Sequence, residues 1–363
     1  MKGSSVLEIN LDTIAENANR VVVKCREKGI EVIGVTKGFS ANHEIVRAMI
    51  AGGIDGLADA RMENIMELRN RNFHNPFTLL RIPRLSNVNN VVRYTETSIN
   101  SEITVMEALS AAATRIRKVH NIILMVDVGD LREGVLQENV LAMAVKIQKM
   151  HGVNLAGLGT NMGCYGGVLP SYENLDVLIT LRDLLEQKLD HKLEVISGGG
   201  TSSLLLVETD GIPQGINQLR IGEGILLGTD TTNNRNIPWL LQDAFHLRAE
   251  VIEVKEKPSM PIGEIGRDAF GNIPHFDDVG ILKRAIISLG KQDVYVEGIC
   301  PVEEKYTILG ASSDHIIVDI TEAGTGIKVG DKMFFTLTYP GLLSASDSRY
   351  IEKEFKGGLR HGS

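Results

Sequence analysis

A lysine at the end of a predicted buried strand is the first candidate for chemistry. Lys37 follows the apolar run Val32–Val35. An amine at such a strand end is partly desolvated, which lowers its pKa toward the range of a useful nucleophile. It could then attack a carbonyl carbon and form a Schiff base. A surface lysine at a strand exit is the alternative interpretation, and the position by itself does not separate the two.

Two glycine-rich segments could hold a phosphate group. Gly198–Ser203 combines three glycines with hydroxyl residues before the apolar Leu204–Leu206, and Arg220–Gly224 is a second glycine-rich strand exit. Glycines let the backbone approach a phosphate, and exposed N–H groups then bind it. A helix N-cap would explain the hydroxyls but not the three glycines. A reactive lysine opposite a phosphate cradle indicates pyridoxal 5'-phosphate, whose aldehyde and phosphate need opposed anchors.

Two further polar residues follow apolar strands. Arg132 lies in the segment Met125–Gly134, and Asn161 ends the segment Gly157–Asn161. Arg132 could face a ligand or belong to a loop held by Asp–Arg pairs. Asn161 could face a ligand or cap a turn.

The elements that must position these residues alternate between short apolar runs and longer amphipathic stretches, as in βα units. Counted along the chain, eight strands are predicted, which favours a closed (β/α)₈ TIM-type barrel over an open sheet. They lie near Glu31–Lys37, Asp55–Asp59, Phe77–Ile82, Thr97–Ser101, Asn121–Val128, Asn154–Asn161, Leu193–Gly198 and Gln218–Gly222. In such a barrel, the loops after strands seven and eight often bind phosphate.

The sequence after about residue 240 changes to β-rich runs and predicts a smaller antiparallel β domain without a long helix. The runs are Phe245–Glu253, Arg284–Leu289, Tyr306–Leu309, His315–Ile320 and Lys332–Leu337. The opening strand Val6–Leu11 could pair with this domain. We therefore expect a barrel over residues 12–235, a β domain from residues 1–11 and 236–355, and a flexible tail at 356–363.

Composition narrows the class of protein. The formal net charge is −8 and the pI is near 5.7, which argues against a nucleic-acid partner because phosphate-backbone binders show a basic face. No apolar run is long enough to span a membrane. Cys25, Cys164 and Cys300 have neither metal-ligand nor CxxC spacing, so we expect no metal and reduced thiols. The cytoplasm is the expected compartment.

The pattern resembles the fold-type III pyridoxal-phosphate enzymes typified by alanine racemase. It is most similar to the ornithine racemase group and its broad-specificity amino-acid racemase relatives. The resemblance extends from about residue 6 to about residue 355 and is carried by these segments: Met125–Gly134, Gly157–Gly166, Val195–Ser203, Leu219–Gly228, Pro258–Asn272, Leu309–Asp319 and Tyr350–Phe355.

Taken residue by residue, the resemblance implies roles around the cofactor ring. Lys37 would carry the cofactor and act as the base on one face, and Arg132 would lie near the phenolic oxygen. Asn161 stands where alanine racemases have a histidine, and Arg220 would face the pyridine nitrogen. Because an arginine keeps its proton, the ring nitrogen would stay largely unprotonated. A weaker electron sink favours reprotonation at Cα, which suits a racemase.

The resemblance also implies the residues that hold the phosphate. Thr201 and Ser202 fall on the hydroxyl segment that binds it, and Gly222 with the nearby backbone would help. Tyr339 resembles a tyrosine of the C-terminal domain that reaches the phosphate.

The residue that acts on the opposite face is missing from the expected place. Alanine racemases have a tyrosine from the partner subunit there, whereas this chain reads Gly263–Asp268 without one. A carboxylate in this role would need burial to stay partly protonated near neutral pH. The candidates are Glu264 and Asp268, then His275 and Asp314, and on the barrel Tyr165, Cys164 or a bound water.

The function that the resemblance implies is racemisation of a free amino acid, by removal of the Cα proton and reprotonation on the opposite face. The substrate would be basic (ornithine, lysine or arginine) or one of a broad range, and Asp314 or Glu264 could hold a distal ammonium. The resemblance also implies a homodimer with active sites shared between subunits. The alternatives are a non-catalytic pyridoxal-phosphate carrier and a decarboxylase or aldolase on the same scaffold.

Overall fold

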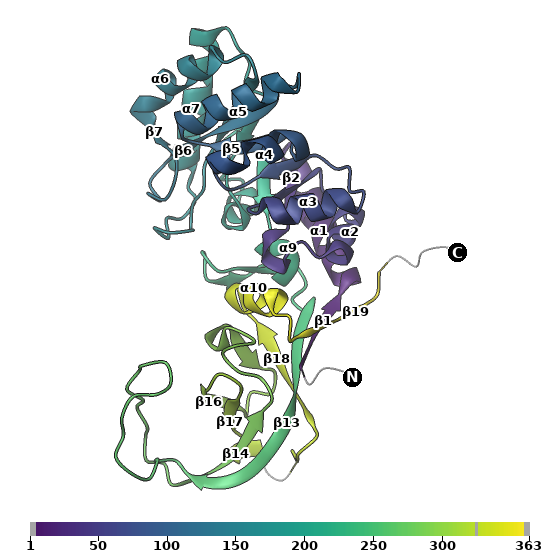
Figure 1. The fold of residues 1–363 in the computed structure, drawn as a ribbon, viewed down its shortest axis with the longest axis vertical. Helices are drawn as coiled ribbons and strands as arrows, with labels where there is room; N and C mark the ends of the chain where they lie inside the picture. Colours follow the sequence, from purple (N-terminus) through teal and green to yellow (C-terminus); the bar gives the residue numbers. More distant parts are fainter. Residues whose placement is uncertain (1–4, 324–325, 359–363) are drawn as a thin grey trace, which may run out of the picture. The chain divides into compact units, whose positions relative to one another are not determined.

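The computed structural model describes residues 5–323 and 326–358, shown as a ribbon in Figure 1. The chain forms two compact units. Within the described ranges, residues 11–242 make one unit, and residues 5–10 with 243–358 make the other.

The first unit is a closed barrel. Leaving the short β7 (Val135–Leu136) aside, its nine-stranded sheet is a ring of parallel strands in which β10 pairs with β2 and β5 pairs with β6. The ring confirms the predicted TIM-type fold. Its strands are β2 (Glu31–Val35), β3 (Gly56–Asp59), β4 (Phe77–Leu79), β5 (Thr97–Asn100), β6 (His120–Asp127), β8 (Val153–Gly159), β9 (Val195–Ser197) and β10 (Gln218–Ile221).

Helices surround these strands in Figure 1. They are α1 (Leu11–Arg26), α2 (His43–Ala51), α3 (Met62–Asn70), α4 (Val88–Tyr94), α5 (Ile103–Arg115), α6 (Gln137–Gln148), α7 (Tyr172–Leu189), α8 (Leu204–Glu208) and α9 (Glu223–Leu227). Apolar strand residues form buried clusters, one around Ile33, Val35 and Ala58 and another around Ile99 and Ile123. A filled interior leaves the strand ends for chemistry.

The barrel unit continues beyond Arg235. The buried Asn17 side chain on α1 donates to the carbonyl oxygens of Ile225 (3.2 Å) and Leu241 (2.8 Å), and it accepts from the Leu241 N–H at 2.8 Å. These contacts attach residues up to Gln242 to the barrel, whereas the sequence pattern assigned residues 236–242 to the β domain.

The second unit is built on a mostly antiparallel sheet, as predicted. Its central order is β15–β18–β13–β14–β17–β16, and β1 pairs antiparallel with β13 and parallel with β19. The strands are β1 (Ser5–Asn10), β13 (Phe245–Pro258), β14 (Ile281–Ile287), β15 (Ile299–Pro301), β16 (Thr307–Ala311), β17 (Ile316–Asp319), β18 (Lys332–Leu337) and β19 (Glu352–Lys356).

Two features of this unit differ from the sequence pattern. A helix, α10 (Tyr339–Asp347), follows β18, and Pro340 in its first turn suits a position where no backbone N–H is needed. Lys356, expected in the tail, is the last residue of β19. Residues 359–363 of that tail lie outside the described part of the chain.

The opening strand is held by packing and by charge. Val6, Leu7 and Ile9 are buried, and the Glu8 carboxylate accepts from Arg248 at 2.6 Å and from Lys356 at 2.5 Å. The opening strand therefore pairs with the domain at the other end of the sequence, as predicted.

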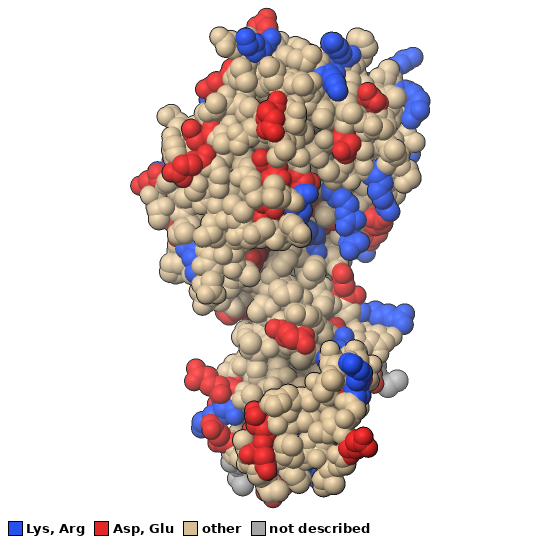
Figure 2. Space-filling model, turned by 90° about the vertical axis from the view of Figure 1, so that its left-hand side faces the viewer, with Lys and Arg blue, Asp and Glu red and all other residues tan. Residues whose placement is uncertain are grey.

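Acidic and basic side chains are interspersed over the face shown in Figure 2. Of the helices in the described ranges, none is both long and apolar enough to cross a membrane. Residues 5–323 and 326–358 contain no group of three or more His, Cys, Asp or Glu side chains arranged to hold a metal ion.

Candidate active site

Lys37 lies just beyond the end of β2, as the first residue of a 3₁₀ turn over Lys37–Phe39. The strand exit is fixed from β3, because the buried Thr36 hydroxyl donates to Asp59 Oδ2 at 2.5 Å and the Thr36 N–H donates to the Ala58 carbonyl at 2.9 Å. Within the part of the chain that the structure describes, the Lys37 amine has no hydrogen-bond or ion-pair partner. It is therefore available to react with a carbonyl.

The surroundings of Lys37 favour its neutral form. Burial lowers the pKa of the amine and the positive charge of Arg132 lowers it further, while Cys164, Asp59 and Glu133 act in the opposite direction. The Lys37 side chain is exposed at the barrel end, although protein atoms surround much of it. A lysine with a lowered pKa is a better nucleophile and base near neutral pH.

Asp59 is a neighbour of Lys37 that the sequence did not single out. It is fully buried at the end of β3, where it also accepts from the Arg61 N–H at 2.8 Å and from Asn64 at 3.1 Å. Burial raises the pKa of Asp59, although the hydrogen bond from Thr36 opposes this. Its position at the end of a predicted strand was the signal that could have identified it.

The loop that carries Arg132 is shaped by its own sequence. Asp127 Oδ1 accepts from the N–H groups of Gly129 at 2.8 Å and Leu131 at 3.2 Å, and Leu131 adopts a left-handed φ of 54°. Gly134 has φ +138°, and a Cβ there would lie 2.5 Å from the Asp127 nitrogen. Only glycine fits that position. The backbone of the turn that carries Arg132 is therefore held in one conformation.

Asp130 ties this loop to the loop after β8. It is 2% exposed and accepts from the backbone N–H groups of Tyr165 (3.0 Å), Gly166 (3.1 Å) and Val168 (3.4 Å). The aspartates of the segment thus hold backbone N–H groups and do not pair with Arg132.

A chain of hydrogen bonds joins three residues that the sequence predicted separately. Arg132 pairs with both oxygens of Glu133, and its Nη2 lies 2.6 Å from Glu133 Oε1. The same Oε1 accepts from Asn161 Nδ2 at 2.6 Å, and Asn161 Oδ1 accepts from Arg220 Nη2 at 2.7 Å. The structure therefore brings Arg132, Asn161 and Arg220 together through Glu133, a residue that sequence reasoning missed.

Arg220 is a buried cation held by neutral acceptors. It is 5% exposed, bonds to Ser197 Oγ and donates to the Thr160 carbonyl at 2.6 Å. Burial lowers the pKa of Arg220 to about 10, below the value of an ordinary arginine. The guanidinium nevertheless stays charged at neutral pH, so it can donate hydrogen bonds without giving up a proton.

The two glycine-rich loops meet at the ends of β9 and β10. Gly199 has φ +102°, and a Cβ on Gly200 would lie 3.3 Å from the Arg220 carbonyl oxygen. Thr201 Oγ1 accepts from the Gly224 N–H at 3.1 Å, which joins the loops directly. The helix after the first loop has only five residues, so hydroxyls and local N–H groups, not a long helix dipole, would bind a phosphate.

These groups fit pyridoxal phosphate. The lysine amine has no partner in the described chain, and a backbone cradle without Cβ atoms and a set of hydroxyls suit an aldehyde and a phosphate. Strand β2, which leads to Lys37, pairs with β10, which leads to Gly222. Both anchors therefore lie at one end of the same barrel.

Glu264 and Asp268 lie in the second unit, in the exposed segment between β13 and β14. Asp268 accepts from the N–H groups of Asn272 at 2.8 Å and Phe270 at 2.9 Å, and the bond from Asn272 is the main cause of a lowered pKa for this carboxyl. A proton donor near neutral pH needs a shift in the opposite direction, so the environment of Asp268 favours a turn-stabilising role.

Of the other predicted residues of this unit, His275 and Asp314 are exposed and Tyr339 is half-buried. His275 lies 3.5 Å from Asp277, and Asp314 accepts from the Ser313 hydroxyl at 2.7 Å. Tyr339 is the first residue of α10. The structure does not group these three residues with one another.

The barrel alternatives for the second proton donor lie on the loop after β8. Tyr165 is 77% exposed, and the exposed Cys164 directs its Sγ toward the Met162 carbonyl at 3.6 Å. Cys164 is among the electrostatic neighbours of Lys37 and Arg220. This thiol therefore belongs to the same end of the barrel.

The comparisons with known proteins agree with this geometry. The family model described as alanine racemase, N-terminal domain, matches residues 9–230. A lysine racemase from Thermotoga maritima is 42% identical over 97% of this chain and 99% of its own length. The chain belongs to the alanine racemase family. Family members depend on pyridoxal phosphate, which identifies the cofactor of this enzyme.

Other family members extend the comparison. An ornithine racemase from Acetoanaerobium sticklandii is 41% identical over 96% of this chain and 98% of its own length. Among solved structures, alanine racemase from Clostridium difficile has a TM-score of 0.77 at 18% identity, covering 98% of this chain and 96% of that one. The enzyme from Streptomyces lavendulae has a TM-score of 0.77 at 17% identity, with 99% of both chains covered. These structural matches confirm the fold.

Proposed function

We propose that this racemase acts on basic amino acids, with Lys37 as the residue that carries the cofactor and moves the Cα proton on one face. The observation that carries the assignment is the Lys37 amine, which has no partner in the described chain and a pKa lowered by burial. The relatives over nearly the whole chain are a lysine racemase and an ornithine racemase, which supports lysine or ornithine as substrate.

Pyridoxal phosphate, when bound, withdraws electrons from the substrate Cα and so acidifies its proton. Thr201, Ser202 and Gly222 would hold the phosphate, Arg132 would donate to the phenolic oxygen, and Tyr339 stays a further candidate for the phosphate. This donor set suits a dianion at one end and a phenolate at the other.

Arg220 would control the ring nitrogen. Its guanidinium is oriented by Ser197, Thr160 and Asn161, and it keeps its proton at neutral pH. It would therefore donate a hydrogen bond to the nitrogen without protonating it. With its nitrogen unprotonated, the ring would be a weaker electron sink, which favours racemisation over transamination.

The opposite face needs a second proton donor. Among the candidates from the β unit we retain Glu264 ahead of Asp268, because the lowered pKa of Asp268 disfavours its acid form. His275 and Asp314, and on the barrel Tyr165 and Cys164, complete the set to be tested. Substitution of the true donor should stop racemisation while Lys37 still exchanges the Cα proton of one enantiomer with deuterium.

We further propose a homodimer that shares its active sites. The segment between β13 and β14 exposes large apolar side chains, including Ile262 at 94%, Ile273 at 70% and Val279 at 64%. Exposed apolar side chains gathered on one segment are typical of a protein interface. Sedimentation of a monomer that keeps full activity would contradict the dimer. The free thiols of Cys25, Cys164 and Cys300 support a cytoplasmic location.

The decisive experiment is incubation of the purified enzyme with single L-amino acids, followed by chiral chromatography. We expect D-lysine and D-ornithine to form faster than D-alanine and D-serine. Loss of carboxylate as CO₂ would indicate the decarboxylase alternative, and binding without turnover would indicate the carrier. Borohydride reduction followed by peptide mapping should place the cofactor on Lys37; label on Lys255 or Lys291 would refute that assignment.

A further inference from the structure

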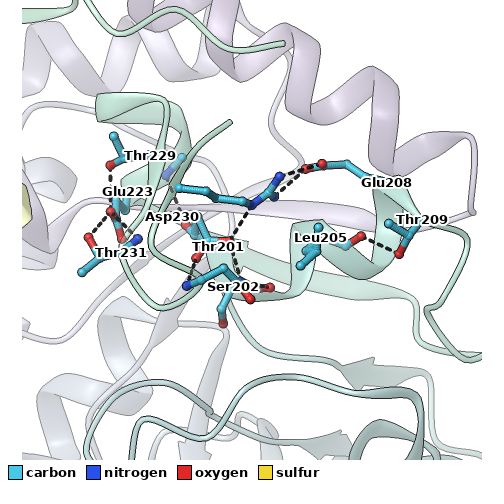
Figure 3. A network of polar contacts seen from close by, with 12 residues as sticks. Thr201, Ser202, Leu205, Glu208, Thr209, Glu223, Thr229, Asp230 and Thr231 are labelled. Atoms are coloured by element: carbon cyan, nitrogen blue, oxygen red, sulfur yellow. Dashed lines mark hydrogen bonds and ion pairs between the residues drawn. The ribbon is translucent and has the colours of Figure 1, made fainter. Parts of the chain in front are cut away.

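A small hairpin beside the glycine-rich loops has no role in the mechanism above. It consists of β11 (Thr229–Asp230) and β12 (Arg235–Asn236), which pair antiparallel. Figure 3 shows Thr229, Asp230 and Thr231 beside Thr201, Ser202 and Glu223. The hairpin is thus next to the loops that would hold the phosphate.

The hairpin contacts the first phosphate loop through Asn233. Asn233 Nδ2 donates to the Ser202 carbonyl at 3.1 Å and to Asp230 Oδ2 at 2.7 Å. Asp230 is 1% exposed and also accepts from the Asn233 backbone N–H at 3.2 Å, which fixes the turn. The Ser202 backbone is therefore tied to a buried carboxylate by a single amide side chain.

Arg235 attaches the same hairpin to a residue further along the chain, at the end of α8. Its guanidinium pairs with both oxygens of Glu208 at 2.8 and 2.7 Å, and its Nε lies 3.4 Å from Asp230 Oδ2. Glu208 ends α8, the helix that follows Thr201–Ser203. The hairpin is thus attached both to the hydroxyl segment, at Ser202, and to the end of the helix that follows it, at Glu208. A bidentate arginine pair fixes the direction of this second contact as well as its distance.

The second phosphate loop is held through Glu223, the residue after Gly222. Its Oε1 accepts from the Thr229 hydroxyl at 2.7 Å, the Thr231 N–H at 3.0 Å and the Thr231 hydroxyl at 2.5 Å. These bonds direct the Glu223 carboxylate toward the hairpin. Without them, its negative charge would repel a nearby phosphate. Burial raises the pKa of Glu223, although the bonds from Thr231 and Thr229 oppose that shift.

The tip of the hairpin reaches a third loop. Thr232 Oγ1 lies 3.5 Å from the Gly163 carbonyl, and a Cβ on Gly163 would lie 2.4 Å from Thr232 Cγ2. The loop after β8, which carries Asn161, therefore packs closely on the hairpin as well.

We propose that the β11–β12 hairpin is the positioning element of the phosphate cradle, and that Asn233 and Thr231 set how tightly the enzyme holds the phosphate group of its cofactor. This inference rests on the proposed function, because it takes the loops at Thr201–Ser203 and Gly222–Gly224 as the phosphate site. It assigns to the hairpin the spacing of the two loops and the orientation of the Glu223 carboxylate.

The experiment compares Asn233→Ala and Thr231→Val with the wild-type protein, each freed of cofactor. Thr209→Val is the matched control, because the Thr209 hydroxyl also makes one hydrogen bond in this region, to the Leu205 carbonyl at 2.8 Å. Dissociation constants are measured by absorbance for pyridoxal phosphate and for pyridoxal, which lacks the phosphate. Competition by inorganic phosphate gives a second readout that needs no turnover.

Asn233→Ala removes the hydrogen bonds to the Ser202 carbonyl and to Asp230 and should weaken pyridoxal phosphate binding by about tenfold. Thr231→Val should weaken it by roughly three- to tenfold, since Glu223 loses one donor. Pyridoxal affinity should change less than about twofold in both variants, because the lost contacts position only the loops that would hold the phosphate. The control should bind both compounds like the wild type, and inorganic phosphate should compete less well in the two hairpin variants.

Equal weakening for both compounds, or no weakening, would overturn the proposal. The ratio of the two affinities protects the test from a general loss of folding, which affects both compounds alike, and a thermal melt of each variant identifies such a loss. A wild-type protein that does not prefer pyridoxal phosphate to pyridoxal would refute the phosphate site itself, and this inference with it.

Discussion

Replacement of Asp130 tests whether the two loops at the barrel end are held as the structure indicates. Asp130 Oδ2 accepts from the Tyr165 N–H, and Oδ1 accepts from Gly166 and Val168. In Asp130→Asn the remaining oxygen can keep the two bonds at Oδ1, while the new NH₂ group faces the Tyr165 N–H. In Asp130→Ala all three bonds are lost.

The expected change in amide exchange rate follows from the number of hydrogen bonds lost in each variant. A hydrogen bond to a charged group contributes about 1.5–3 kcal/mol, so the Tyr165 amide should exchange with solvent roughly 10- to 150-fold faster in Asp130→Asn. The Gly166 and Val168 amides should change little in that variant. In Asp130→Ala all three amides should exchange fast.

Hydrogen exchange read by NMR or mass spectrometry provides the assay. The Tyr165 N–H donates to Asp130 at 3.0 Å, so slow exchange of this amide in the wild type should depend on Asp130. Asp183→Asn is the control, since Asp183 is an exposed residue that pairs with Arg182 on α7. A Tyr165 amide that exchanges as fast as a free peptide in the wild type, or equally in wild type and Asp130→Asn, would refute the reasoning.

Three other predictions concern stability. Arg220→Gln should cost about 3 kcal/mol in urea unfolding, because buried acceptors lose their donor; a cost under about 1 kcal/mol would contradict the network. Burial raises the pKa of Glu8, but hydrogen bonds from Lys356 and Arg248 outweigh burial and leave the pKa lowered. The carboxylate therefore stabilises the protein above pH 4.5, and this contribution decreases as the pH falls. Glu8→Gln should therefore cost about 1 kcal/mol at neutral pH, and the difference from wild type in a melt should shrink in acid. Burial lowers the pKa of His120 from 6.5 to about 4. The free energy of unfolding should therefore fall as the pH drops from 6.5 to about 4. His120→Gln should remove about 3 kcal/mol of that acid sensitivity, and an unchanged pH profile of unfolding would refute it.

The barrel could be predicted because its signals are local. Each strand is a short apolar run, and glycines or polar residues mark where the run ends, as at Lys37 after Val32–Val35. The residues that follow such runs lie at one end of a parallel barrel by construction of the fold. This is why Arg132, Asn161 and Arg220, predicted one by one, are joined by hydrogen bonds in the structure.

The sequence could not reveal which residues form hydrogen bonds between loops that follow different strands. Glu133 joins Asn161, and Asp130 holds the backbone at Tyr165, across 28 and 35 positions of sequence. No local pattern specifies which carboxylate meets which loop. The helix α10 escaped prediction for another reason: it has only nine residues, and Pro340 and Gly341 near its start are typical of turns.

The pairing of β1 with β13 and β19 also bears on the order of synthesis. Ser5–Asn10 leave the ribosome long before their partners, because β13 begins at Phe245 and β19 ends at Lys356. The barrel unit, residues 11–242, is complete before any strand partner of β1 has been translated. The β unit can therefore close only after Lys356 has been translated, whereas the barrel can fold earlier. A nascent chain that stalls before Lys356 would keep its first strand without its parallel neighbour, and that unpaired edge would be open to association with other chains.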